Sequence, residues 1–262
     1  MHEAHTDLIL DIGNTRSKLG LFKASGSLRT GTMANGDMVA LREFIGSDRP
    51  VAIALGSVAA PDDGFLARLR ELAPVFVFDG ASEAPIRNKY ATPATLGADR
   101  LANVVAGARR FPGRPVLVAD LGTCITYDVS EADGTYAGGA ITPGMVMRAK
   151  AMNAYSARLP LVDPPEAPNN LGTSTREALE AGIHHGILGE MREFVRAYGK
   201  ERPSMAVVLT GGDALRFARA MESGIFAIPF LTLEGYHALL EHHRSIHHGA
   251  RPAGAGGAGG AG

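Results

Sequence analysis

Two short segments place an aspartate at the end of an apolar run, directly before a glycine and small polar residues. They are Asp11-Ile12-Gly13-Asn14-Thr15 and Asp120-Leu121-Gly122-Thr123. Successive backbone N–H groups in such a turn form a concave site for phosphate oxygens, and glycine lets a ligand approach the chain closely. Both carboxylates would repel a phosphate, so we expect Mg²⁺ between them, a hard ion that binds carboxylate, water and phosphate oxygens. One such turn alone is better explained as an aspartate that caps the turn, but two copies favour a phosphate site.

A third candidate site is Gly97-Ala98-Asp99-Arg100, where a loop leads into a predicted helix. In a functional interpretation, Asp99 is a general base aimed at a substrate hydroxyl, and the fork of Arg100 holds a substrate carboxylate. In the structural alternative, Asp99 is an anion that stabilises the helix N-terminus, and Arg100 is its solvated neighbour. These four residues alone favour the structural alternative.

Other segments carry weaker indications. Residues 138–144, at the end of a predicted strand, indicate either a close backbone approach to a ligand or a plain turn. Residues 210–213 indicate either a helix N-terminus that attracts anions or a short strand-to-helix loop. Cys124 is expected in the core, and the histidine-rich run at 242–248 lacks metal-ligand geometry.

Short apolar runs alternate with helical periods along the whole chain. In the first half we predict strands at 8–12, 18–22, 51–55 and 75–78 and helices at about 63–72 and 96–110. In the second half we predict strands at 115–120, 125–129, 136–141 and 206–209 and helices at about 175–198 and 231–243.

The two halves open alike. Residues 8–22 and 116–130 each contain an apolar strand, Asp, an apolar residue, Gly, a small polar pair and a second strand. This layout predicts an α/β fold of two related domains, each a mixed sheet flanked by helices, with a cleft between them. We place the first domain at residues 1–112, the second at 113–248 and a flexible Gly/Ala tail at 249–262.

Composition excludes several classes of protein. The chain has 262 residues, of which 45% are hydrophobic and 20% charged, unlike a disordered, collagen-like or disulfide-stapled chain. A net charge of −1 does not indicate a nucleic-acid or membrane partner. The N-terminal segment lacks the basic region of a signal peptide, and the single cysteine fits a reducing compartment.

Seven segments match, in order, those of a known family. They are DIGNTRSKLGLF (11–22), NKYATPATLGADR (88–100), DLGTCITYD (120–128), GGAITPGMVMRAKAM (138–152), ARLPLV (157–162), TREALEAG (175–182) and LTGGDA (209–214). The chain resembles the type III pantothenate kinases, which belong to the acetate and sugar kinase, Hsp70 and actin superfamily. Each segment alone is a weak signal, but the ordered set is specific and spans nearly the whole folded chain.

The resemblance implies two ribonuclease-H-like domains and ATP-dependent phosphorylation of the 4′-hydroxyl of pantothenate, the first step toward coenzyme A, by a cytoplasmic homodimer. It implies that Asp99 accepts the proton, that Asp120 helps to hold a monovalent cation (K⁺ or NH₄⁺), and that Asp11 lies near Mg²⁺ bound through the phosphates. The implied ATP contacts are Asp11, Ile12, Gly13, Asn14, Thr15, Arg16, Ser17, Lys18 and Thr123. The implied pantothenate contacts are Tyr90, Gly97, Ala98, Asp99, Arg100 and Thr175, the last near the dimer interface.

Three alternatives compete with this interpretation. The first is another kinase of the superfamily that acts on a different small hydroxyl compound, with changes confined to the substrate region. The second is a non-catalytic or moonlighting regulator related to the Bvg accessory factor, although such a protein would not need Asp11, Asp99 and Asp120. The third is an ATP-driven conformational protein like Hsp70 or actin, for which the chain is too short.

Overall fold

Two sheets of mixed strand direction form the framework of the chain, which the computed structural model describes over residues 5–57, 62–221 and 224–248. The first sheet has the strand order β3-β2-β1-β4-β5, and the second has the order β11-β10-β7-β8-β9-β6. The strands are β1 Thr6–Ile12, β2 Arg16–Lys23, β3 Leu28–Ala34, β4 Ala52–Ser57, β5 Val75–Phe78, β6 Arg87–Asn88, β7 Val116–Leu121, β8 Cys124–Ser130, β9 Thr135–Pro143, β10 Ala206–Thr210 and β11 Ile225–Ala227.

Both sheets are built around the same hairpin. Strand β1 pairs antiparallel with β2 and parallel with β4, and β7 pairs antiparallel with β8 and parallel with β10. Strands β1, β7 and β10 are buried along almost their whole length, because helices cover both faces of each sheet. The predicted α/β fold with two related mixed sheets is therefore confirmed.

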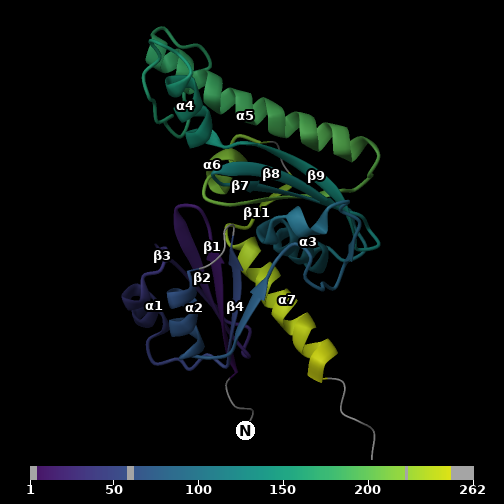
Figure 1. Ribbon diagram of the computed structural model, residues 1–262. Coiled ribbons are helices and arrows are strands. Elements are labelled where there is room, and N and C mark those ends of the chain that lie inside the picture. The colour runs from purple at the N-terminus through teal and green to yellow at the C-terminus, as the bar shows by residue number, and fades with distance from the viewer. Residues whose placement is uncertain (1–4, 58–61, 222–223, 249–262) are drawn as a thin grey trace, which may run out of the picture.

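The helices form layers on either side of the two sheets (Figure 1). They are α1 Met38–Ile45, α2 Asp63–Arg70, the 3₁₀ turn η1 Pro93–Thr95, α3 Ala98–Arg110, α4 Met145–Ala154, α5 Thr175–Lys200, α6 Ala214–Ala218 and α7 Leu231–His248. Helices α1 and α2 cover the outer face of the first sheet, and α4 and α5 cover the outer face of the second. Helices α3 and α7 pack against each other between the sheets. None of the described helices is both long and apolar enough to cross a membrane.

Two glycines let the central helices approach their neighbours closely. A Cβ atom on Gly235 of α7 would overlap the carbonyl oxygen of Ala102 in α3. The buried ring of Tyr236 occupies the space where Gly56 of β4 lacks a side chain. Helix α7 is therefore held against both α3 and the first sheet, and it supports the N-terminal end of α3, where Asp99 lies.

Two segments cross the domain boundary that the sequence predicts at residue 112. Strand β6, from the first half, pairs with β9 of the second sheet. Helix α7, from the end of the second half, contacts strands β1, β2, β4 and β5 of the first sheet. The division into 1–112 and 113–248 stays a prediction, and the Gly/Ala tail at 249–262 lies outside the described residues.

Several short elements were not predicted, although one had a clear signal. Asp37 accepts hydrogen bonds from the backbone at the start of α1, and Gly46 ends this helix with a positive φ of 61°. Met38, Leu41 and Ile45 are buried at helical spacing between these two ends. By contrast, β3 is an edge strand with mostly exposed residues, so its sequence lacks the alternation that marks a half-buried strand.

Candidate active site

A cavity of about 370 Å³ opens where the β1–β2 turn, the β7–β8 turn and the start of α3 come together. The predicted site residues in its lining are Asp11, Gly13, Asn14, Thr15, Arg16, Lys18, Tyr90, Gly97, Asp99, Arg100, Asp120 and Thr123. The lining also includes Thr95, Gly122, Cys124, Thr126 and Ile141. Residues as far apart in the sequence as Asp11 and Ile141 thus share one cavity.

The charged side chains that line this cavity are those of Asp11, Asp99, Asp120, Lys18, Arg16 and Arg100. Lys18 lies opposite Asp11 in the β1–β2 ladder, with 3.4 Å between Lys18 Nζ and Asp11 Oδ2. Burial raises the pKa of Asp11, and the Lys18 ammonium only partly opposes this effect. Burial alone would lower the pKa of Lys18, but the carboxylates of Asp120 and Asp11 outweigh it and raise this pKa. Lys18 therefore stays charged, and a phosphate would meet both a fixed cation and carboxylates able to share a metal ion.

The first turn is shaped by side chains that point away from the cavity. The Asn35 amide donates to the carbonyl oxygen of Gly13 at 2.9 Å, and the Ser17 hydroxyl donates to Asn35 Oδ1 at 2.8 Å. Ser17 is fully buried, and Ile12 also lies outside the cavity lining. Both residues were predicted as ATP contacts, but in this structure Ser17 helps to hold the turn and Ile12 packs against the apolar core of the first sheet. Asn35 was missed because only the third strand brings it beside the turn.

The second turn is held by glycines from distant segments. A Cβ atom on Gly144 would overlap the carbonyl oxygen of Gly122, and one on Gly211 would overlap the carboxylate of Asp120. Gly211 also has a φ of 91°, which disfavours any other residue. The Asn103 amide donates to Asp120 Oδ2 at 2.9 Å. The glycine-rich segments around 138–144 and 210–213 thus include glycines that let the chain pack closely around the Asp120 turn.

Asp99 lies where both interpretations of the sequence place it, in the first turn of a helix and in the lining of the cavity. It lies in the first turn of α3, and its Oδ1 accepts a hydrogen bond from the Arg100 backbone N–H at 2.8 Å. Burial, followed by the nearby carboxylates of Asp120 and Asp11, raises the pKa of Asp99 to about 6. A helix N-terminus normally favours the charged form, so this environment is unusual for a residue that only caps a helix. A carboxyl group with such a pKa in a cavity is suited to general base chemistry.

Arg100 differs from its predicted solvated or substrate-clamping arrangements. It is only 4% exposed, and its Nε and Nη2 atoms donate to the carboxylate of Asp128 at 3.0 and 2.6 Å. Its Nη1 atom donates to the Tyr90 hydroxyl at 3.3 Å. The guanidinium fork is therefore occupied within the protein, and the solvated alternative is wrong. Sequence reasoning did not single out Asp128, although this residue ends the matched segment DLGTCITYD.

Two predicted substrate contacts lie outside this cavity. Ala98 is buried in the core between the sheets, where its side chain cannot face a ligand. Thr175 is exposed at the start of α5, beside the capping residue Ser174, and does not line the cavity. Within the described residues, no group of three or more His, Cys, Asp and Glu side chains is arranged to hold a metal ion.

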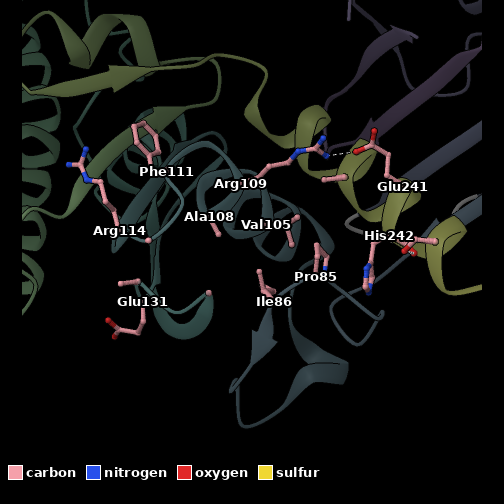
Figure 2. A pocket seen from close by; sticks show the side chains of 15 residues that line it. Pro85, Ile86, Val105, Ala108, Arg109, Phe111, Arg114, Glu131, Glu241 and His242 are labelled. Atoms are coloured by element: carbon pink, nitrogen blue, oxygen red, sulfur yellow. Dashed lines mark hydrogen bonds and ion pairs between the residues drawn. The ribbon is translucent and has the colours of Figure 1, made fainter.

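A larger cavity of about 530 Å³ lies between α3, α7 and the β8–β9 turn (Figure 2). Its apolar floor includes Ile86 and Val105, and Arg109 and Glu241 form an ion pair at its edge. Arg114, also in its lining, donates to the carbonyl oxygen of Ser204. This cavity shares no lining residue with the first one and contains none of the predicted site residues.

Comparison with known proteins identifies relatives over most of the chain. The family model for type III pantothenate kinase matches residues 7–197. A type III pantothenate kinase from Bacteroides fragilis is 37% identical over 238 residues, which cover 90% of this chain and 98% of that protein. One from Christiangramia forsetii is 34% identical over 241 residues, which cover 91% of this chain and 99% of that protein.

Solved structures with low sequence identity share the fold. A conserved Baf-family protein from Campylobacter jejuni has a TM-score of 0.58 at 18% identity, covering 91% of this chain and 99% of that one. The activator of 2-hydroxyisocaproyl-CoA dehydratase from Clostridium difficile, solved with bound ADPNP, has a TM-score of 0.52 at 14% identity. That match covers 92% of this chain and 97% of the activator. At these identities the likeness concerns the fold alone.

Proposed function

Since the chain belongs to the type III pantothenate kinase family, we propose that it transfers the γ-phosphoryl group of ATP to the 4′-hydroxyl of pantothenate, the first step toward coenzyme A. The observation that carries this proposal is the position of Asp99. Its carboxyl group, with a pKa of about 6, shares a cavity with both phosphate-type turns and with Lys18. The acceptor hydroxyl and the donor phosphates could thus meet in one place.

The residues of the cavity suit a phosphoryl transfer between ATP and an alcohol. Such transfer depends mainly on alignment and on neutralising charge at the phosphates. In our proposal the backbone of the first turn and Lys18 bind the phosphates, with Thr123 as a further ATP contact. Asp99 accepts the proton of the 4′-hydroxyl as the new P–O bond forms and the bond to the leaving ADP oxygen breaks.

The chemistry of the carboxylates fits a divalent ion that is shared with the nucleotide. Asp11 is buried with a single nearby ammonium group, and carboxylate and phosphate oxygens are the ligands that Mg²⁺ prefers. Mg²⁺ would neutralise charge on the phosphate oxygens. We further propose that Asp120 helps to bind K⁺ or NH₄⁺, supported by its carboxylate at the cavity wall.

The proposal extends to the assembly and the compartment. We propose a cytoplasmic homodimer, in which Thr175 contributes to the pantothenate site near the interface. This would account for the position of Thr175 outside the cavity of a single chain. Sedimentation of the purified protein gives the mass of the assembly, and a monomer at assay concentrations would contradict the homodimer.

The test is ADP release by purified protein with Mg-ATP, with and without pantothenate, followed by mass spectrometry of the product. We expect pantothenate-dependent ADP and a singly phosphorylated product. ADP release without pantothenate dependence would discard this acceptor, and a panel of small hydroxyl compounds would then test the alternative kinase. No ADP from folded protein would favour a non-catalytic regulator. Replacing K⁺ with Na⁺ should lower the rate, whereas equal rates would contradict the role proposed for Asp120.

A further inference from the structure

A buried carboxylate that has no assigned part in the reaction holds the Arg100 guanidinium. Asp128 is 1% exposed and accepts hydrogen bonds from Nε and Nη2 of Arg100. The Tyr136 hydroxyl donates to the same carboxylate at 2.6 Å. Neither Asp128 nor Tyr136 lines the cavity, so they can reach a substrate only through the residues they touch.

These contacts close into a ring of four side chains. The rings of Tyr90 and Tyr136 stack with centroids 5.8 Å apart and an angle of 3° between their planes. Arg100 donates to the Tyr90 hydroxyl, and its guanidinium carbon lies 5.3 Å from the centre of the Tyr90 ring. Each of the four residues therefore touches two others, and only Tyr90 and Arg100 face the cavity. A network of this kind restricts its members more strongly than single contacts do.

The strands are shaped to accommodate this network. Gly139 of β9 lies opposite Asp128 of β8, and a Cβ atom there would lie 2.8 Å from Asp128 Oδ1 and would overlap the Tyr127 carbonyl oxygen. A register shift at Val129 and Ser130 then places Tyr136 opposite Ser130. Such irregularities re-aim side chains next to functional sites. Tyr136 and Gly139 thus both accommodate the Asp128 carboxylate, one by donating a hydrogen bond and the other by lacking a side chain.

We propose that Asp128 and Tyr136 are positioning residues for the acceptor substrate: they fix Arg100 and Tyr90 at the substrate end of the cavity. This inference rests on the proposed function. Asp128 occupies the Nε–Nη2 edge of Arg100, so only the Nη1 edge can donate to pantothenate. Asp128 also pairs with the Arg100 guanidinium, so the charge of this group is balanced inside the protein.

The test compares steady-state kinetics of wild type, Asp128→Asn, Tyr136→Phe and the control Ser130→Ala. Ser130 is buried on the same face of β8 but is outside the ring. We expect Asp128→Asn to lower kcat/KM for pantothenate about 100-fold, the scale of a misplaced binding group, with KM for ATP within about twofold of wild type. Tyr136→Phe, which keeps the Asp128–Arg100 ion pair, should lower kcat/KM for pantothenate about tenfold. Asp128→Asn should also move the acidic limb of the pH–rate profile to lower pH, because the Asp128 charge, which helps to raise the pKa of Asp99, would be lost.

The outcomes separate the inference from the proposed function. If wild type shows no pantothenate-dependent turnover, the proposed function and this inference fail together. If wild type turns over and Asp128→Asn and Tyr136→Phe keep its KM for pantothenate and its pH profile, the inference alone is overturned. A parallel rise in KM for pantothenate and KM for ATP would also overturn it. An equal loss of kcat/KM in Ser130→Ala would do the same. If Asp128→Asn does not fold, Tyr136→Phe decides: its KM for pantothenate must rise while its KM for ATP stays close to wild type.

Discussion

Replacing Asp99 with asparagine should make the protein more stable at neutral pH while it abolishes most turnover. Burial and the neighbouring carboxylates of Asp120 and Asp11 raise the pKa of Asp99 from 3.8 to about 6. This difference corresponds to about 3 kcal/mol of folding free energy that the charged form costs at pH 7.5. Asparagine has nearly the same shape and carries no charge, so Asp99→Asn should recover up to about 3 kcal/mol.

The sign of this effect depends on pH. Because the folded-state pKa exceeds the unfolded value, the folded protein binds the proton more tightly between pH 3.8 and about 6. The contribution of Asp99 to stability is fully present below about pH 4 and is lost as the pH rises through 6. The gain from Asp99→Asn should therefore be close to zero at pH 4 and reach its full size by pH 7.5. Urea unfolding followed by circular dichroism at several pH values measures it.

The activity of the wild-type protein should rise with pH, whereas the contribution of Asp99 to stability falls. The ionised fraction of Asp99 falls about tenfold between pH 7 and pH 5, so wild-type kcat/KM should fall by a similar factor. Asp99→Asn should lose about 100-fold or more in kcat, whereas Asp63→Asn, at the exposed start of α2, should keep wild-type turnover. The reasoning is refuted if Asp99→Asn is less stable than wild type at pH 7.5. A flat wild-type profile between pH 5 and 7 would equally remove Asp99 as the base.

Three further substitutions test other parts of the structure. Lys18→Met should lower kcat about 100-fold in the ADP assay, because a fixed cation is lost at the phosphates; an unchanged kcat would contradict this role. Burial alone would raise the pKa of Asp7, but the side chains of His237 and Arg244 outweigh it and lower the pKa to about 2. Asp7→Asn should thus cost about 2 kcal/mol at pH 7, and this cost should shrink as the pH falls from 4 to 2, as urea titrations at these pH values can show. Gly235→Ala should lower the Tm through about 1–3 kcal/mol of overpacking against α3, whereas an unchanged Tm would mean that the helices separate freely.

Local sequence patterns were sufficient for the main elements and for much of the site. The hairpin turns at Asp11 and Asp120 contain their own glycine and polar residues, and the apolar runs before them predict buried strands. The helix that begins near Asp99 was equally clear from its apolar spacing. Since each pattern lies within a few consecutive residues, no knowledge of distant contacts was needed.

Short elements with mostly exposed residues were harder to predict, as β3 and β6 show. Strand β6 has only two residues, and it exists because β9 supplies the backbone partners. The same limit applies to Ser17 and Ile12, which are adjacent to the true lining residues but point away from the cavity. Their direction depends on the alternation of β1 and β2 and on Asn35 from a later segment.

The sequence by itself determined the two sheets and the paired phosphate-type turns, because these depend on local periodicity and residue type. The choice of Asp99 as the base candidate came from the ordered resemblance to a known family. Only the tertiary structure decided the environment of those groups. The pKa of Asp99 depends on carboxylates from two other strands, and the state of Arg100 depends on Asp128, 28 residues away. Burial and electrostatic interaction are properties of distances in space, and chain packing sets those distances.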